Sequence, residues 1–419
     1  MFLHILNIVS STYQKLRFLV SNFSLKHFAG PMQFNRKVNF VFACSRVDRT
    51  LSIDGHSYSR ILDPISWQLE KLGFSVEHAS WDLPSGTDFY KYKSIKLILR
   101  FSFLSSLFLK KLCKPDIIVL IGMPKIFTDI ASSLGIKVIE AFHGFGIPFN
   151  CWMYGVNQTL PIACYKYIVF DDQTLSTLLA NEHVSNIAVR CKHPYLLNHE
   201  FLADTNTLGN SRKSIDHLRK KASRQYKYTA LVTLQHGYEG TRSFLKGILP
   251  NGIIHESLIE TIRSRDDIFW ILRFHPVQIG RSEVKKLAIL LENVFLDCQN
   301  VSFDIAFSSF DILDLLAICH FHVTMMSGTI TEAAMMNIPS LALCPTFNNP
   351  DLMQFSFKLA ADRKLLFLCK LDQESINKQL KNILNRRLMA TDPFEFFHEQ
   401  EADLPKASDW LASLVQSTY

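Results

Sequence analysis

The chain has 419 residues, of which 48% are hydrophobic and 20% are charged, so it is too long for one compact core and too apolar to be disordered. Its nine cysteines include no Cys-x-x-Cys pair, which argues against a disulfide framework or a zinc ribbon and favours reduced thiols in a cytosolic protein. The net charge of +7 favours acidic partners such as nucleoside diphosphates or phospholipid headgroups, and nucleic acid is not expected because aromatic residues do not alternate with the basic runs.

Residues 1–37 form a basic leader that could lie near a membrane. Its apolar run precedes Lys15 and Arg17, the reverse of a signal peptide, and is too short to span a bilayer. The stretch Lys96–Lys114 is typical of an amphipathic helix on an anionic surface, and equally of a helix packed on a sheet with its lysines in water. We therefore expect a cytoplasmic protein and leave open a peripheral contact with the inner face of the membrane.

Apolar strands alternate with helices in residues 38–196. This alternation predicts a parallel sheet covered on both faces, hence an N-terminal Rossmann-like domain. Strands are expected at Val38–Cys44, Phe74–His78, Asp116–Ile121, Lys137–Phe142, Tyr167–Phe170 and Asn186–Cys191, and helices at Ser59–Leu72, after Pro124 and through Glu182.

Residues 197–227 interrupt the pattern with clustered lysine and arginine, and we interpret them as the interdomain linker. From residue 228 to residue 419 the alternation restarts, which predicts a second Rossmann-like domain with C-terminal helices. Its strands are expected in YTALVTL, IFWILRF, NVSFD, FHVTMM, SLALC and LLFLC, and its helices near Ile254–Arg263, Glu283–Leu291, Ile312–Ile318, Thr331–Met336 and Met353–Arg363.

The most informative stretch runs from Phe321 to Leu343 and combines a strand, a Ser-Gly-Thr turn and a short helix. Backbone amides near Gly328 and Thr329 would face a phosphate, and Glu332 would accept from ribose hydroxyls. The pattern Thr329-x-x-Glu332 also fits a capping box that serves only the helix. Because ligands bind where the strands of open parallel sheets end, we favour nucleotide binding.

Three expected strands end in a turn that carries histidine, namely His143, His236 and His275. In the first two turns glycine follows, which lets a ligand approach the backbone. A single histidine of this kind is usually structural, but three in matching positions suggest a shared crevice. Asp171 and Asp172 also follow a strand, and we interpret Asp172 first as a helix N-cap.

Two Rossmann-like domains, an Arg-x-His-Pro turn and a later Ser-Gly-Thr-x-x-Glu resemble GT-B glycosyltransferases of bacterial surface polysaccharide synthesis, including capsule transferases, sialyltransferases and CDP-glycerol glycerophosphotransferases. The resemblance implies an α/β fold of two Rossmann-like domains facing across a cleft. It also implies that the donor phosphate meets the turn and the His-Pro motif, with Glu332 on the ribose. The donor-binding residues would be His236, Arg273, His275, Pro276, Ser327, Gly328, Thr329 and Glu332.

The same resemblance makes His143 a candidate general base, although Phe145 to Pro148 replace the Thr-Pro that follows it in the glycerophosphotransferases. Asp171 and Asp172 are the alternative bases. The polar loop after the first strand would face the acceptor, or be a solvated loop with ion pairs. It contains Arg46, Asp48, Arg49 and His56. We expect no metal and no cofactor, because no Asp-x-Asp follows a strand and His320-x-His322 fits packing better than coordination.

The expected function is transfer of a sugar from a nucleotide-sugar donor to a glycan or lipid-linked acceptor, in the synthesis of capsule, O-antigen or lipopolysaccharide. Three alternatives stay open: a CDP-glycerol-type glycerophosphotransferase, a GT-B-like nucleotide-sugar epimerase, and a non-catalytic nucleotide-binding protein. An epimerase needs no acceptor, so turnover without added glycan separates it from a transferase.

Overall fold

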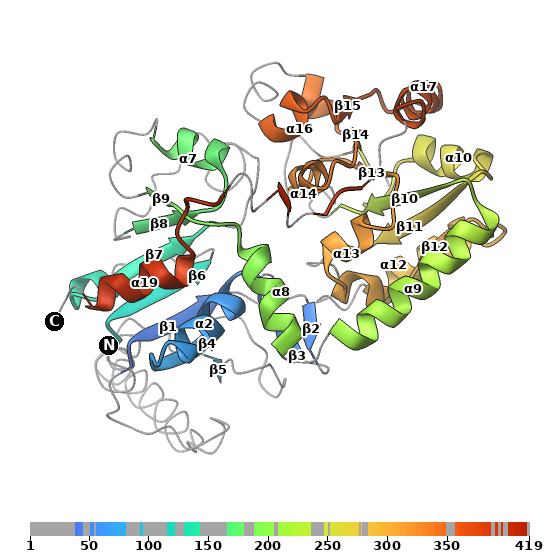
Figure 1. Ribbon diagram of the computed structural model, residues 1–419. Helices are drawn as coiled ribbons and strands as arrows, with labels where there is room; N and C mark the ends of the chain where they lie inside the picture. The colour runs from blue at the N-terminus through green and yellow to red at the C-terminus, as the bar shows by residue number, and fades with distance from the viewer. Residues whose placement is uncertain are drawn as a thin grey trace, which may run out of the picture.

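The fold consists of two parallel sheets with flanking helices, one from each half of the chain (Figure 1). In the described part, no helix is long and apolar enough to cross a membrane. The leader and the stretch 96–114 lie outside the described residues. The computed structural model describes residues 38–44, 51–53, 56–80, 93–94, 115–121, 130–142, 166–179, 188–204, 208–235, 247–249, 252–275, 278, 284–348, 357–386, 390–392, 395–396 and 401–416.

The first sheet has seven parallel strands in the order β5-β4-β1-β6-β7-β8-β9. Chain order runs outward from β1 in both directions, so the point where it reverses lies between β1 and β6. Every residue of β6 is buried, as expected for a strand covered on both faces. The strands are β1 (Phe40–Cys44), β4 (Val76–Ser80), β5 (Lys93–Ser94), β6 (Ile117–Ile121), β7 (Lys137–Ala141), β8 (Lys166–Val169) and β9 (Ala188–Arg190).

The second sheet has six parallel strands in the order β12-β11-β10-β13-β14-β15. It repeats the arrangement of the first sheet, and its point of reversal lies between β10 and β13. All six residues of β11 are buried. The strands are β10 (Tyr228–Thr233), β11 (Ile268–Arg273), β12 (Val301–Phe303), β13 (Phe321–Thr324), β14 (Ser340–Ala342) and β15 (Leu366–Leu368).

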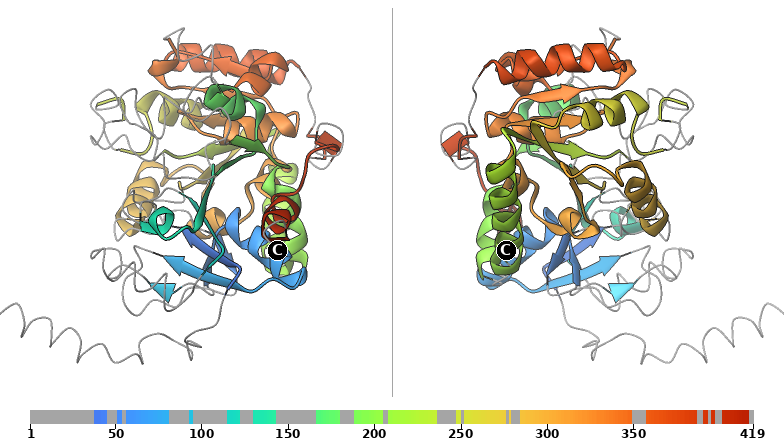
Figure 2. Two further views of the ribbon diagram at one scale, coloured as in Figure 1. Left: turned by 90° about the vertical axis from the view of Figure 1, so that its left-hand side faces the viewer. Right: turned by 90° about the vertical axis from the view of Figure 1, so that its right-hand side faces the viewer.

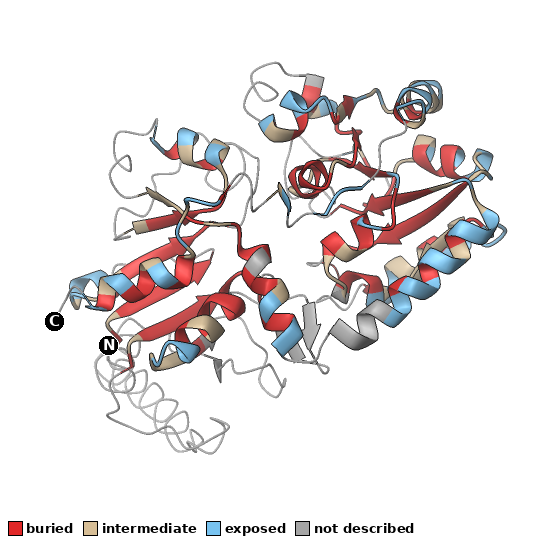
Figure 3. Cartoon of the chain, viewed as in Figure 1, coloured by how far each residue is buried: buried red, intermediate tan, exposed pale blue. Residues whose placement is uncertain are grey.

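Helices shield the sheets from solvent, and Figure 3 shows buried sheets beneath helices whose outward sides are exposed. The helices of the first half are α2 (Leu62–Lys71), α7 (Asp172–Leu179) and α8 (Pro194–Asp204). Further along the chain come α9 (Leu208–Gln225), α10 (Glu256–Ser264), α12 (Val284–Val294), α13 (Ile312–Leu316), α14 (Thr329–Met335), α16 (Lys358–Asp362), α17 (Gln373–Leu384) and α19 (Ala407–Gln416), with 3-10 turns η5 (Ile305–Ser309) and η6 (Pro345–Asn348).

The α/β fold of two Rossmann-like halves is confirmed, and each strand named above from the sequence is present within a few residues of its expected bounds. The helix expected at Ser59–Leu72 is α2, and it ends where predicted because Gly73 has a φ of +88°, which closes a helix without steric cost. The helix α17 is one of the C-terminal helices expected after the last strand, whereas the strand β5 was not anticipated.

The connection between the halves contains two helices, α8 and α9, whereas the sequence pattern predicted only a linker there. Helix α8 packs on α2, and Asp204 at its end accepts a hydrogen bond from the Trp67 indole (3.0 Å). Helix α9 buries Ile215, Leu218 and Ala222 against the core.

The last helix, α19, does not belong with the second sheet, and the expectation that placed it there is corrected. It packs on α2 of the first half, and Leu411 and Val415 are buried in the core there (Figure 1; Figure 2 shows both sides of the molecule). Just before it, Glu401 accepts from the His193 backbone N–H (2.6 Å) and from Arg190 (2.7 Å). The segment 401–416 therefore completes the first domain.

The polar loop after β1 contains a short antiparallel hairpin rather than coil alone. Its strands are β2 (Leu51–Ile53) and β3 (His56–Tyr58). Strand β2 contacts η5, so a segment of the first half touches the second.

Candidate functional site

Three turns meet at the carboxyl edge of the second sheet, where the strand order reverses. They follow β10, β11 and β13. The side-chain amide of Gln235, after β10, donates to the Thr324 hydroxyl at the end of β13 (3.0 Å). Gln278 joins the other turn, because its amide donates to the Gln235 carbonyl (3.0 Å) while its side-chain oxygen accepts from the His275 N–H (2.9 Å). The backbone of His275 is thus fixed beside the point of reversal.

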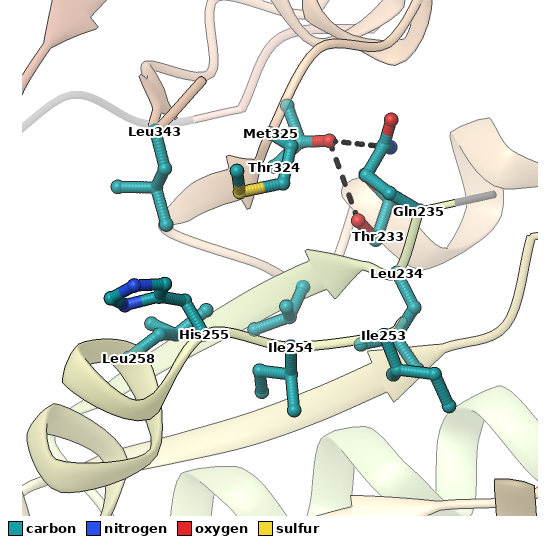
Figure 4. Close-up of a pocket in the computed structure, with 11 residues that line it drawn as sticks. Thr233, Leu234, Gln235, Ile253, Ile254, His255, Leu258, Thr324, Met325 and Leu343 are labelled. Carbon is teal, nitrogen blue, oxygen red and sulfur yellow. Dashed lines mark hydrogen bonds between the residues drawn. The ribbon is translucent and has the colours of Figure 1, made fainter. Parts of the chain in front are cut away.

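A small pocket lies next to these turns. Figure 4 shows Gln235 and Thr233 directed toward Thr324 on one side. The Thr324 hydroxyl also donates to the Thr233 carbonyl (3.3 Å), so the polar groups on this side of the pocket are hydrogen-bonded to one another. The remaining lining is mostly apolar and includes Ile253, Ile254, His255, Leu258, Met325 and Leu343.

The Ser-Gly-Thr turn connects β13 to α14. Gly328 is the N-cap residue, and no side chain caps its helix. The Ser327 and Thr329 hydroxyls are 3.0 Å apart, and the Ser327 oxygen accepts from the Thr329 N–H (3.3 Å). The capping-box interpretation is therefore wrong, because Glu332 does not return to the helix start.

Glu332 instead binds two residues of the first half. Its Oε1 accepts from Arg60 Nη2 (2.9 Å) and from the Tyr195 hydroxyl. The Arg60 guanidinium also lies over the Tyr195 ring, 4.9 Å from its centroid. Glu332 is 1% exposed, and burial raises the pKa of its carboxyl while Arg60 opposes the rise. Its partners are 272 and 137 residues away, so sequence spacing gave no signal for them.

Arg273 is buried at the end of β11 and points its donors into the protein. Its guanidinium donates to the carbonyls of Phe307 (3.2 Å), Ser308 (3.1 Å) and Phe310 (3.3 Å). Desolvation lowers its pKa to about 9, with Arg60 adding to the shift, so it stays charged at neutral pH. This packing assigns Arg273 to fixing η5 and disfavours its predicted role as a donor ligand.

Asp171, rather than Asp172, caps helix α7. Its carboxylate accepts from the backbone N–H and the hydroxyl of Thr174, both at 2.7 Å. Asp172 is the first residue of the helix, its side chain is 89% exposed, and it forms an ion pair with Arg190 (3.1 Å). The interpretation of Asp172 as the N-cap is corrected, and the role of either residue as a base stays a prediction.

The pair His320 and His322 serves packing. The ring of His322 is fully buried and bonds to Thr233 (2.8 Å) and Ser340 (3.0 Å), joining three strands. Desolvation lowers its pKa to about 3. His320 accepts from the Thr229 N–H (3.0 Å). Over the described ranges, no group of three potential metal ligands occurs.

Several predicted site residues lie outside the described residues, and their roles stay predictions. The side chain of His56 is also not described, although its backbone pairs with Ile53. The residues outside are His143, His236, Pro276, Arg46, Asp48 and Arg49.

No protein-family model matches the sequence, and no curated protein matches it. Solved structures do match the fold. A UDP-GlcNAc 2-epimerase from Methanocaldococcus jannaschii, in complex with UDP-GlcNAc and UDP, has a TM-score of 0.60 at 15% identity over 90% of this chain and 99% of that one.

Two bacterial structures are similar to the same extent. A putative UDP-N-acetylglucosamine 2-epimerase from Listeria monocytogenes has a TM-score of 0.57 at 13% identity, covering 91% of this chain and 95% of that one. The UDP-GlcNAc 2-epimerase from Neisseria meningitidis, bound to UDP-GlcNAc, has a TM-score of 0.56 at 12% identity, covering 90% and 100%. At such low identity these likenesses show the fold alone, the two-domain GT-B fold.

Proposed function

We propose that the protein is an enzyme that binds a nucleotide sugar at the carboxyl edge of its second sheet and epimerises it. The observation that carries the proposal is the joining of three turns by Gln235 and Gln278 at the point where strand order reverses. That point is where open α/β sheets bind ligands. Two of the similar structures hold UDP-GlcNAc, one of them with UDP as well, so a uridine nucleotide is the first choice of ligand.

In this proposal the Ser327–Thr329 turn takes the phosphates and Glu332 accepts from the ribose. The His275 turn, held by Gln278, contributes to the same phosphate site. Inverting a sugar carbon requires removal of its proton and return of a proton to the opposite face. His143 and His236 would carry these transfers, with Asp171 or Asp172 as alternatives, because both histidines follow strands in the sequence.

Epimerisation is favoured over sugar transfer because the three similar structures described above carry the names of epimerases. This chain aligns with 95% or more of the length of each. Transfer to a glycan or lipid-linked acceptor in surface polysaccharide synthesis is the second candidate, supported by the Arg-x-His-Pro and Ser-Gly-Thr-x-x-Glu motifs. Under either proposal the protein would act in the cytoplasm. Contact with the inner face of the membrane is proposed only if the protein is a transferase.

The test is incubation of the purified protein with UDP-GlcNAc in deuterated buffer, followed by NMR. Deuterium at C2 and a second epimer, without any acceptor, are the expected result. Release of UDP only after a glycan acceptor is added would favour the transferase. Binding of UDP without turnover would favour a non-catalytic protein, and thermal shift with no response to CMP, CDP, UDP, GDP or ADP would overturn nucleotide binding.

A further inference from the structure

A polar cluster joins the two halves of the protein at Glu332. Arg60 precedes α2, Tyr195 lies in the first turn of α8, and Glu332 lies in α14 of the second half. Both donors come from the first half and both end on the same oxygen, Oε1. The carboxylate of one domain is therefore oriented by side chains of the other.

The second carboxylate oxygen, Oε2, is left for another donor. A carboxylate can accept about four hydrogen bonds. Within the part of the chain that the structure describes, no donor reaches Oε2, although the side chain is only 2% exposed. Oε2 is not among the fully buried side-chain atoms that lack a partner, so it stays within reach of a ligand hydroxyl.

The donors themselves are firmly held. Tyr195 is 1% exposed, and its ring lies 4.2 Å from that of His193, whose backbone N–H is bound by Glu401. Arg60 rests on the face of Tyr195. Its side chain keeps 30% of its surface exposed, so the cluster opens toward solvent on the Arg60 side.

We propose that Arg60 and Tyr195 are positioning residues for nucleotide binding: they hold Oε1 of Glu332 and leave Oε2 to accept from a ribose hydroxyl. This inference rests on the proposed function. It means that the ribose site of the second domain is complete only when the first domain is docked against it. Neither residue carried any signal in the sequence, because the contact spans both domains.

A purely structural role of the Arg60–Glu332 ion pair would predict a different result from a positioning role. If the cluster only joined the domains, changes to Arg60 or Tyr195 would alter stability without altering discrimination between riboses. If it positions Oε2, the same changes selectively weaken nucleotides that carry ribose hydroxyls. The informative quantity is therefore the ratio of two affinities, which a general loss of stability does not move.

The experiment compares UDP with 2′,3′-dideoxy-UDP by titration calorimetry. The wild type is expected to prefer UDP by about tenfold, which corresponds to about 1.4 kcal/mol. Tyr195→Phe and Arg60→Gln should each reduce the preference to about threefold or less, with dideoxy-UDP affinity unchanged. Arg60→Lys should restore part of the preference. Tyr226→Phe is the matched control, because Tyr226 follows the last residue of α9 and its hydroxyl donates to the Gln299 carbonyl (2.9 Å) rather than to Glu332.

Each outcome decides one question. A wild-type preference for UDP that persists in both variants overturns the positioning role and leaves the proposed function intact. Equal affinity of the wild type for the two nucleotides would show that Glu332 does not contact the ribose, and it would overturn this inference. Binding of neither nucleotide would instead count against the proposed function. Should Tyr195→Phe fail to fold, the two Arg60 variants give the same comparison, because that side chain is partly exposed.

Discussion

Acid is expected to destabilise the second sheet through His322. The ring is completely buried between β10 and β14, and its two nitrogens bond to the hydroxyls of Thr233 and Ser340. Two hydroxyls can satisfy a neutral ring, with one nitrogen donating and the other accepting. Protonation would place a charge in this site without a counter-charge among these partners, and desolvation therefore lowers the pKa to about 3.

The magnitude follows from linkage. The pKa in the folded protein is depressed below the unfolded value of 6.5, so His322 favours folding fully above pH 6.5 and less as the pH falls toward 3. In this window each pH unit costs about 1.4 kcal/mol. Between pH 7.5 and pH 5.0 the loss from this ring amounts to about 2 kcal/mol.

The assay is urea unfolding at pH 7.5 and pH 5.0, followed by tryptophan fluorescence, since Trp270 is buried in the same sheet. His322→Gln should be less stable than the wild type at pH 7.5, yet lose about 2 kcal/mol less on acidification. His217→Gln, at an exposed histidine of α9, should keep the wild-type pH dependence. An equal loss in the wild type and His322→Gln would refute the reasoning.

Three further predictions concern the site and its supports. Arg273→Leu should lower the unfolding free energy in urea by about 3 kcal/mol or more, because two buried carbonyls and a partly buried one lose a charged donor; an unchanged urea midpoint would contradict this. Glu332→Gln should keep or raise the melting temperature, since an amide avoids burying a charge, while UDP affinity measured by calorimetry falls about tenfold. A lower melting temperature with unchanged affinity would count against that view. Asp171→Ala should cost about 1 kcal/mol as a lost N-cap in thermal unfolding, and Asp172→Ala should have little effect, so equal losses would reassign the cap.

The strands could be predicted because burial on both faces demands continuous apolar sequence. Ile117–Ile121 and Ile268–Arg273 are examples, and both are buried throughout. The order of the strands could not be derived in the same way, since it depends on which strands pair. The hairpin at 51–58 was missed because its polar residues look like a loop.

Helix α9 was not predicted because its many charged residues obscure the helical spacing of its few apolar residues. Lysine and arginine dominate its sequence, but Ile215, Leu218 and Ala222 recur at helical spacing and are the residues that the helix buries. Helix α8 also carried a signal, proline at its first position, where the missing N–H has no partner to lose.

The candidate site could be predicted only as a set of turns. The sequence placed Ser327 and His275 after strands, and the structure agrees. It could not predict that Gln278 would tie the His275 turn to β10, or that Arg60 would meet Glu332. Those contacts join residues that come together only through tertiary packing, so no local pattern encodes them.

The return of α19 to the first domain affects how the protein folds during synthesis. Leu411 and Val415 fill the core around α2, yet they follow the whole second sheet in the sequence. A ribosome therefore releases all six strands of the second sheet, which end at Leu368, before it releases the helix that covers the first. We therefore expect the first domain to keep an apolar surface uncovered until the C-terminal segment emerges, so that it is completed only after the second domain has been synthesised.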